Sequence, residues 1–382
     1  MRTTTTPRQR SSRQGERVVR TVDDHLAWPL LTLLALVVVI MDDASGGVSR
    51  AQFPSLGPVP FAHGSTGAGV PLFFAASAAL ICRAVRRHGR GGALLRWATR
   101  VMPTYWVLVL VVLVVATLQP LPASVSAEHL SVPDVIDNLI LVPRLVATPW
   151  VDVSYWLLGA QLLALMGAVI LWPAVRRSQP ALDLLLVLLL ITPWVAGRAA
   201  GGPVAWDELT GRLWLATGGE HLYGWVIGVA FWAYATGAMS RSRAAVYLCG
   251  AVAAAALGSG TIRTALVVGA VVIVVAASFA LPDSHAPHPG LRFAANLSLP
   301  VFLTHNALSI ALALALSSSG ALSGWSVTAL LVLAPWALGT VVWFAVHRPL
   351  LRWLSLDVDL FPVPSRRRSR GRRPAPTVAS HS

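Results

Sequence analysis

Arginine residues in one short stretch are the part of this sequence with the clearest chemistry. Six of them lie within eighteen residues, in a connection without acidic residues that joins two apolar segments: Arg83, Arg86, Arg87, Arg90, Arg96 and Arg100. Arg96 and Arg100 are four residues apart, so a helix would present both guanidinium groups on one face. Pro103 follows them, at a position that suits the first turn of a further helix. Because paired guanidinium groups suit phosphate recognition, we expect Arg96 and Arg100 to bind a phosphorylated ligand.

The earlier arginines of this stretch have a second interpretation. Arginine-rich connections between membrane spans stay in the cytoplasm, whatever else they do. We therefore assign Arg83 to Arg90 mainly to the orientation of the chain in the membrane. The anionic partner of the whole cluster is left open between lipid headgroups and a phosphorylated ligand.

Ionisable residues inside or at the edge of apolar segments form a second group of candidates, because burying a charge in hydrocarbon is costly. They are Asp42, Asp43, Asp183, Arg263 and His305, with His25 and His63 nearby. A lone histidine in a helix, such as His305, more often packs through a hydrogen bond than acts as a base. The sequence contains no zinc signature, phosphate-binding loop, serine nucleophile elbow or dinucleotide fingerprint, so hydrolase, nucleotide-driven and redox functions have no support.

The elements that must position these residues are membrane helices. Of the 382 residues, 55% are hydrophobic and 12% are charged, and the mean hydropathy is +0.65. A soluble globular protein of this size is far less apolar. The formal charge of +14 comes from arginines in loops and tails, so no nucleic acid is expected as a partner. The composition predicts an all-α, multi-pass integral membrane protein in contact with lipid.

About ten segments provide the roughly 17 to 25 mostly apolar residues that a membrane crossing needs. They lie near residues 26–41, 66–83, 101–118, 153–173, 181–197, 222–239, 244–258, 262–281, 299–317 and 323–346. With the N-terminus inside, most of the 30 arginines fall on the cytoplasmic side, as the positive-inside rule requires. We therefore predict a polytopic bundle of about ten helices with both termini cytoplasmic.

The ends of the chain and the outer loops are more polar. Residues 1–21 and 355–382 are basic and are predicted to be disordered cytoplasmic tails around a single membrane domain, residues 22–354. Acidic residues gather in the predicted outer loops, Asp152 among them, and most are interpreted as solvated surface.

Six segments of the chain resemble the acyltransferase 3 family, a group of multi-span membrane proteins. The segments are GVPLFFAASAALI from Gly69, RWATRVMPTYW from Arg96, NLILVP from Asn138, SYWLLGAQ from Ser154, LSLPVFLTHNAL from Leu297 and HRPLLRWL from His347. The corresponding family patterns include GVDLFFVLSGFLI, RRLLRLLPPYW, WSLGVE, ISYPIYLLHQPL and ERPLRRLL. The resemblance extends over residues 22–354, so it covers all the predicted spans.

The resemblance implies a function. Family members transfer an acyl group from cytoplasmic acyl-CoA, across the membrane, to a hydroxyl of a sugar, polysaccharide or similar acceptor. It implies acyl-CoA binding by Arg96, Arg100 and Tyr105, with acyl-CoA as a co-substrate and no bound cofactor or metal. It also implies a cavity or acceptor site lined by Trp156, Gln161 and His305. An acetyl group, a cell-envelope glycan or metabolite, and the plasma membrane are the corresponding expectations.

The first predicted span departs from the family pattern. In the family this span carries an arginine followed ten residues later by a histidine, which is proposed to act as the general base. Thr32 and Asp42 occupy these two places here. A carboxylate at the membrane edge can serve as a base if desolvation raises its pKa. Asp42 is therefore the candidate base, with Asp43 and His63 as alternatives.

Two glutamates of the family pattern are also replaced, by Gln161 and His347. Two functions fit this combination of matches and departures. The first is a membrane O-acyltransferase. The second is a catalytically lapsed relative that acts as a membrane scaffold or lipid-glycan partner. A transporter is not favoured, because the spans carry no evident acid and base pairs or inverted halves.

Overall fold

The computed structural model describes the chain in nine ranges: residues 27–46, 67–119, 121–122, 125, 130–200, 208–259, 261–280, 289–317 and 324–356. Over these ranges the structure is helical and contains no strand, so the predicted all-α class is confirmed. Residues 1–21, nearly all of 355–382, and His63 lie outside the described part of the chain.

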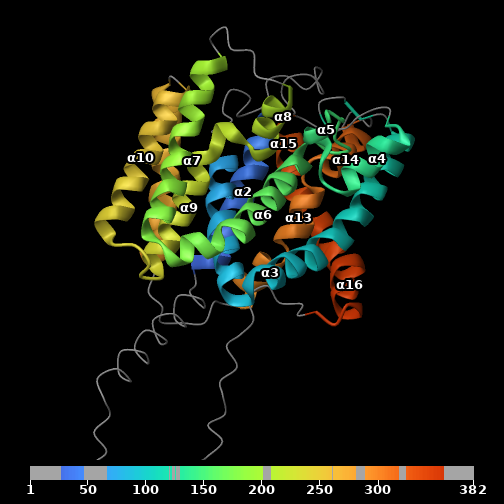
Figure 1. Ribbon diagram of the computed structural model, residues 1–382. Helices are drawn as coiled ribbons and strands as arrows, with labels where there is room; N and C mark the ends of the chain where they lie inside the picture. Colours follow the sequence, from blue (N-terminus) through green and yellow to red (C-terminus); the bar gives the residue numbers. More distant parts are fainter. Residues whose placement is uncertain are drawn as a thin grey trace, which may run out of the picture.

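Long helices make up most of the molecule (Figure 1). The longer ones are α2 (Ala27–Gly46), α3 (Gly69–Leu118), α6 (Trp156–Arg177), α7 (Gln179–Ala200), α9 (Leu222–Ala235), α10 (Arg241–Ser259), α11 (Ile262–Ala280), α14 (Ala307–Ser317) and α15 (Gly324–Val342). The shorter ones are α4 (Val132–Leu139), α5 (Pro143–Val146), η2 (Val153–Tyr155), α8 (Glu208–Thr217), η3 (Gly219–His221), α12 (Pro289–Asn296), α13 (Ser298–Thr304), η4 (Trp343–His347) and α16 (Arg348–Trp353).

Helix α3 contains both the second and the third predicted spans together with the arginine-rich connection between them. Its 50 residues would extend about 75 Å if straight, more than twice the hydrocarbon core of a membrane. The helix bends instead at Gly89, whose φ of 73° and ψ of 174° suit only a glycine. Figure 1 shows the first arm running down beside α2 and the second rising towards α4. The arginines therefore lie on helical segments on either side of the bend between the two arms.

Two expectations about this region are corrected. The arginine-rich segment was expected to be a loop, but it is helical except at Gly89, because the other glycines of the segment, Gly91 and Gly92, keep helical backbone angles. Pro103 was expected in a first helical turn, but it lies well inside α3. Membrane helices tolerate an interior proline, because neighbouring helices and local adjustments satisfy the backbone groups that it frees.

Membrane-crossing length is met by fewer helices than the ten predicted. Within the described residues, four segments are long and apolar enough: Gly69–Leu118, Val153–Arg177, Ile262–Phe279 and Trp325–Trp353. Helices α13 and α14 pass the same test together and meet at a bend of 53°. The structure thus supports a helical membrane protein, while the count of ten spans and the side of each terminus stay predictions.

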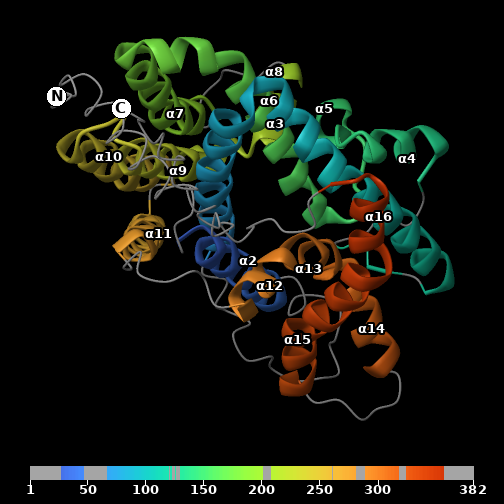
Figure 2. The ribbon, with the colours of Figure 1, turned by 90° about the horizontal axis from the view of Figure 1, so that it is seen from below.

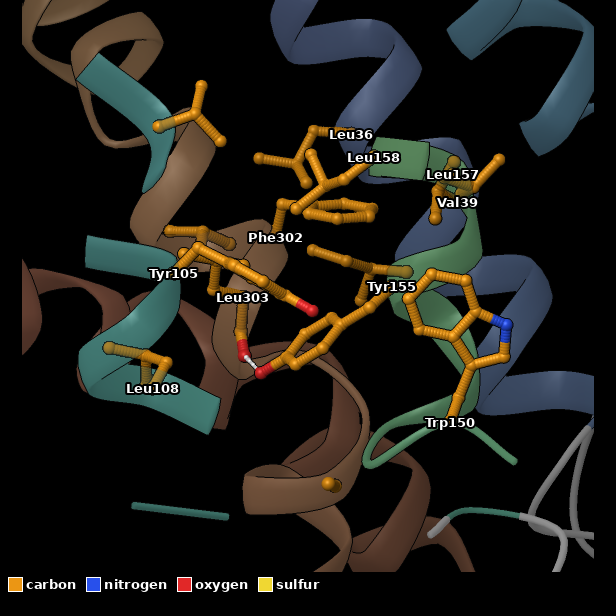
Figure 3. Packing of buried hydrophobic residues seen from close by; sticks show 14 of the residues in the cluster. Leu36, Val39, Tyr105, Leu108, Trp150, Tyr155, Leu157, Leu158, Phe302 and Leu303 are labelled. Atoms are coloured by element: carbon orange, nitrogen blue, oxygen red, sulfur yellow. Dashed lines mark hydrogen bonds between the residues drawn. The ribbon is translucent and has the colours of Figure 1, made fainter. Parts of the chain in front are cut away.

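The helices pack around α3 in two groups. Seen from below in Figure 2, α7, α9, α10 and α11 lie on one side of α2 and the first arm of α3, and α13 to α16 lie on the other. Each group has its own buried cluster, one containing Tyr105, Tyr155 and Leu303 and the other containing Tyr223, Phe231 and Tyr247. In the first cluster the Tyr155 hydroxyl donates to the Leu303 carbonyl oxygen at 2.9 Å (Figure 3). This bond ties the start of α6 to α13.

Candidate active site

A cavity of about 350 Å³ lies between α2, the two arms of α3, α6, α13 and η4. Its lining changes in character along the first arm of α3, from Phe73 through Ser77 to Arg87. Phe73 and Arg87 are fourteen residues apart on this arm, which is about 21 Å along the helix axis. The cavity is therefore an elongated space with an aromatic end and a basic end.

Four arginines form the basic end. Arg96 and Arg100 both line the cavity, and they come from the segment between the bend at Gly89 and the second arm. Arg83 and Arg87 line it from the first arm. Arg83 is buried, and its guanidinium group lies 5.8 Å from the centre of the Trp28 ring. The bend of α3 brings the two pairs of arginines to the same end of the cavity.

The arginine cluster therefore divides differently from the prediction. Arg96 and Arg100 do share a face, as their spacing predicted. Arg83 and Arg87, which were assigned mainly to membrane orientation, lie on the cavity with them. Their spacing of four residues is the same as that of Arg96 and Arg100, so the signal was present in the sequence.

Hydrogen-bonding side chains line the middle of the cavity. Gln161 of α6 donates through Nε2 to the Ser77 hydroxyl at 2.7 Å. Its Oε1 accepts from the Trp97 indole nitrogen at 3.4 Å. All three residues line the cavity. This polar chain links α3 to α6 and offers groups that can bind amides of a ligand.

The opposite end of the cavity is apolar. The rings of Phe73 and Phe302 stack there, with centroids 5.6 Å apart and an angle of 22° between their planes. Leu36 of α2 and Leu158 of α6 also line this end and lie beside Phe302 in Figure 3. This end of the cavity is thus lined by side chains from four different helices.

An acid and histidine pair lies directly beyond Phe302. His305, at the bend between α13 and α14, has its Nε2 2.7 Å from Oδ2 of Asp43 near the end of α2. Its Nδ1 donates to the carbonyl oxygen of Phe302, since a carbonyl can only accept. Nε2 and the Asp43 carboxyl group must then share a proton. The His305 side chain is fully enclosed, whereas that of Asp43 is 46% exposed.

Asp152 fixes the bend that carries His305. Its Oδ1 accepts from the Asn306 amide at 2.8 Å and from the backbone and hydroxyl groups of Ser154. Its Oδ2 accepts from the Ala307 backbone N–H at 2.9 Å, at the start of α14. The carboxyl group is completely buried. The expectation that the outer-loop acids are solvated is therefore wrong for Asp152, because four donors replace its water shell.

Several predicted site residues lie elsewhere. Asp42 does not face His305 in the described contacts; its Oδ2 accepts from the Gly69 backbone N–H at 2.7 Å, at the start of α3. Tyr105 does not line the cavity, and its hydroxyl donates to the Asn138 carbonyl oxygen at 2.7 Å. Trp156 is also outside the lining; the Arg144 guanidinium lies 4.1 Å from its ring centre.

A further histidine on the cavity comes from the closing motif of the chain. His347 is buried at the end of η4, a π-helical turn, and lines the cavity. Its Nδ1 lies 2.7 Å from the Thr104 hydroxyl of α3. His347 stands where the family pattern has a glutamate, so this departure falls on the site.

Aromatic side chains surround Phe74, the residue that follows Phe73 in α3. The Trp225 ring stacks on it at 4.7 Å, and the His221 ring meets it edge-on at 6.4 Å. His221 lies in η3, before α9, and its Nδ1 is 3.0 Å from the Tyr223 hydroxyl. Burial, helped by the positive charge of Arg144, lowers the pKa of His221 to about 4. This histidine is therefore neutral at pH 7.

Among the described residues, no three histidine, cysteine or acidic side chains are grouped so that they could hold a metal ion. The arrangement combines a basic end, a hydrogen-bonding middle and an apolar end, with an acid and histidine pair next to Phe302. Phosphate recognition and proton transfer are the two kinds of chemistry that these groups supply.

Comparison with known families agrees with this chemistry. A family model described as an acyltransferase domain, the acyltransferase 3 model, matches residues 28–347. The chain therefore belongs to this acyltransferase family, and the resemblance inferred from the sequence motifs is confirmed. No curated protein and no solved structure is significantly similar to the chain.

Proposed function

We propose that this protein is a membrane O-acyltransferase that moves an acyl group from acyl-CoA to a hydroxyl of a cell-envelope glycan or metabolite on the other side of the membrane. The observation that carries the proposal is the graded cavity that runs from the arginines to Phe302, whose ring lies beside that of His305 in the acid and histidine pair. Each part of the cavity corresponds to one part of an acyl-CoA molecule.

The donor would lie along the first arm of α3. Its phosphates pair with Arg96 and Arg100, supported by Arg83 and Arg87, because guanidinium groups bind phosphate through paired hydrogen bonds. The amides of the pantetheine arm meet the polar chain of Gln161. The thioester then reaches the apolar end, where water is excluded.

The orientation follows from charge. Arginine-rich segments at the ends of membrane spans stay on the cytoplasmic side, so the basic end of the cavity faces the cytoplasm, where acyl-CoA is made. Asp43 then lies towards the outer face. The acceptor approaches from that side and never has to cross the membrane.

The reaction needs a group that accepts the hydroxyl proton. Asp43 supplies it, since its carboxyl group is reachable from the outer side, and His305 holds the carboxylate in place through Nε2. The acceptor oxygen attacks the thioester carbonyl carbon as its proton passes to Asp43. The new C–O bond forms, the C–S bond breaks, and the sulfur leaves with the bonding electron pair. The thiolate takes a proton from cytoplasmic water, and Asp43 returns its proton to water outside.

The proposed base is therefore Asp43, one residue after Asp42, the candidate base inferred from the sequence. Asp42 carries a structural bond to the start of α3, whereas Asp43 contacts a histidine. General acid–base groups of this type contribute roughly 10² to 10⁴-fold in rate. The family histidine of the first span is thus replaced by a carboxylate on α2 and a histidine contributed by the α13–α14 bend.

Release of CoA thiol from acetyl-CoA, measured in proteoliposomes supplied with glycan acceptors, tests the proposal. Asp43→Asn should lower turnover by at least about 10²-fold. Asp42→Asn is the matched control, because an asparagine oxygen still accepts from the Gly69 N–H. Equal losses in the two variants would contradict the assignment of Asp43. Acyl-CoA binding without turnover, for every acceptor, would instead favour the lapsed relative that acts as a membrane scaffold or lipid-glycan partner.

A further inference from the structure

A second cavity, of about 240 Å³, lies between the first arm of α3 and helices α6, α7 and α9. Aliphatic and aromatic side chains line it, and none of its lining residues is charged. Figure 1 shows α6 and α7 diverging from the connection that joins them. Both helices also carry large exposed apolar side chains, such as Ile170 on α6 and Leu184 on α7. Lipid therefore surrounds the two helices that enclose this cavity.

One face of α6 forms the long wall of the second cavity. Its lining residues run from Ala160 to Val175, which is about 22 Å along the helix axis. Small residues occupy the middle of this wall, and a Cβ atom added at Gly167 would meet no atom within 4 Å. The hydrocarbon core of a bilayer is about 30 Å thick, so the chains of one leaflet reach about 15 Å. The wall is long enough for one such chain.

Positive charge lies at one end of the second cavity. Helix α6 ends with Arg176 and Arg177, directly after the lining residue Val175. Both arginine side chains are exposed, and neither has a hydrogen-bond or ion-pair partner among the described residues. Basic groups beside an apolar space between membrane helices are suited to the headgroup of an anionic lipid.

An indole group of α9 lies near the same end. The ring centre of Trp232 is 5.6 Å from that of Trp172, which precedes Arg176 by one helical turn, and both tryptophans line the cavity. Trp232 is 6% exposed, and its indole nitrogen is buried without a hydrogen-bond partner in the described part of the chain. Since buried donors nearly always have an acceptor, this nitrogen indicates a ligand that carries one.

We propose that the second cavity binds one acyl chain of an anionic phospholipid from the cytoplasmic leaflet. The chain lies along Gly167, an ester carbonyl accepts from the Trp232 indole nitrogen, and the phosphate pairs with Arg176 and Arg177. This order matches the order of groups in a phospholipid, whose ester carbonyls lie just below its phosphate. The α6–α7 connection is on the same side of the molecule as the bend of α3 (Figure 1). Arginine-rich span ends face the cytoplasm, where the anionic lipids of the membrane gather.

Native mass spectrometry of the purified, delipidated protein tests this inference. Phosphatidylglycerol and phosphatidylcholine with the same dioleoyl chains are titrated separately, so that the two lipids differ only in their headgroups. We expect one phosphatidylglycerol to be retained at least about 10-fold more tightly than phosphatidylcholine, because two arginines favour the anionic headgroup. Equal retention of the two lipids would overturn the inference and would indicate non-specific surface lipid only.

Filling the middle of the cavity should abolish this retention. Gly167→Leu places a side chain in the space for the acyl chain, and leucine favours a helix more than glycine does, so α6 should still form. Gly269→Leu is the matched control. An added Cβ at Gly269 of α11 also meets no atom within 4 Å, and Gly269 does not line the cavity. Unchanged retention in a Gly167→Leu variant that elutes as folded protein would overturn the inference.

The headgroup and carbonyl contacts are separated by two further variants. Arg176→Gln combined with Arg177→Gln should lower phosphatidylglycerol affinity to that of phosphatidylcholine and leave phosphatidylcholine unaffected. Arg348→Gln combined with Arg352→Gln is the control, since it removes the same charge from α16, which does not line the cavity. Trp232→Phe should weaken both lipids by a similar factor of about 5, because both carry ester carbonyls.

A second copy of this chain on the same face would give a different result. It would appear as a dimer without lipid mass that Gly167→Leu dissociates, and this outcome would contradict the lipid site. None of these measurements requires acyl-CoA or turnover. Their failure would therefore leave the proposed acyl transfer untouched, and a failure of acyl transfer would leave the lipid site in place.

Discussion

The two ends of the cavity are assembled in different ways. The basic end takes all four arginines from one helix, at spacings of four residues within each pair, and the bend at Gly89 brings the pairs together. The pair at the other end joins Asp43 and His305 across 262 residues of sequence. The first arrangement follows from helical periodicity, while the second depends on how distant helices pack.

This difference extends to the way each end is supported. The arginines of the donor end are partly or fully exposed, except for the buried Arg83. His305 is enclosed and is held by the buried Asp152 through Asn306 and Ala307. A change at the donor end should therefore weaken one ligand contact, whereas a change near His305 should disturb a connected network.

The largest expected effect is the loss of catalysis without loss of donor binding. His305→Gln removes the ring that holds Asp43, so kcat should fall by at least about 10²-fold while the affinity for acetyl-CoA stays within a few-fold. Steady-state kinetics and direct binding of acetyl-CoA measure the two quantities. His347→Gln, at a buried histidine that lines the cavity without contacting Asp43 in the described bonds, should spare kcat. If His305→Gln also lost affinity for acetyl-CoA, the two ends of the cavity would not act independently.

The next effect concerns the support of His305. In Asp152→Asn one carboxylate oxygen becomes an NH₂ group, so either the Ala307 N–H or the donors on Oδ1 lose their acceptor. A buried donor without a partner costs roughly 1–3 kcal/mol in the free energy of unfolding, and a displaced His305 should lower kcat by about 10-fold or more. Thermal unfolding and kinetics would show both losses together.

Asp137→Asn is the matched control for this variant. Asp137 is in the same outer segment, but among the described residues its carboxyl group accepts from one side chain, the Thr148 hydroxyl at 3.0 Å, which can turn to suit an amide. Its stability and kcat should stay close to those of the wild type. If Asp152→Asn behaves like Asp137→Asn, the buried carboxylate does not position His305.

A smaller effect is expected at the donor end. Arg96→Ala and Arg100→Ala should each raise KM for acetyl-CoA by about 10-fold with little change in kcat, because a charged hydrogen bond at a half-exposed site is partly screened by water. Arg90→Ala is the control, since Arg90 is exposed and does not line the cavity. Equal effects of all three substitutions on KM would show that the cluster acts only through its overall charge.

The sequence predicted what depends on local spacing. The helical class, the shared face of Arg96 and Arg100, and Gln161 at the cavity all follow from periodicity or from motif similarity. The arginine-rich connection was expected to be a loop, but among its glycines only Gly89 leaves the helical conformation. Composition alone could not tell which glycine would turn the chain.

The sequence could not predict the pairing of residues from distant helices. Asp42 and Asp43 are neighbours with the same chemistry, and only packing decides that one caps α3 and the other meets His305. Asp152 was grouped with outer-loop acids that are mostly solvated, and two of its four donors, Asn306 and the Ala307 N–H, come from distant sequence. These choices rest on tertiary contacts, which a single sequence does not record.

The smallest effect on catalysis is expected for a second histidine, His221. His221 packs on Phe74 but does not line the cavity, so its protonation should change stability and leave catalysis alone. Its pKa of about 4 in the folded protein lies below the ordinary value of about 6.5 that it regains on unfolding. Unfolded chains therefore bind more protons between these values, and stability falls as the pH drops from about 6.5 towards 4.

This loss should reach about 1 kcal/mol at pH 5.5 and about 3 kcal/mol at pH 4. His221→Phe keeps a ring against Phe74 but cannot titrate, and it removes the bond to the Tyr223 hydroxyl. It should therefore lower the thermal midpoint near pH 7.5, and this deficit should shrink as the pH falls, because the midpoint of the variant no longer depends on the titration of His221. Thermal unfolding from pH 4.5 to 7.5 measures both. If His221→Phe instead lowered kcat as His305→Gln does, the aromatic side chains around Phe74 would be coupled to the acyl-transfer site. The two regions would then not be independent.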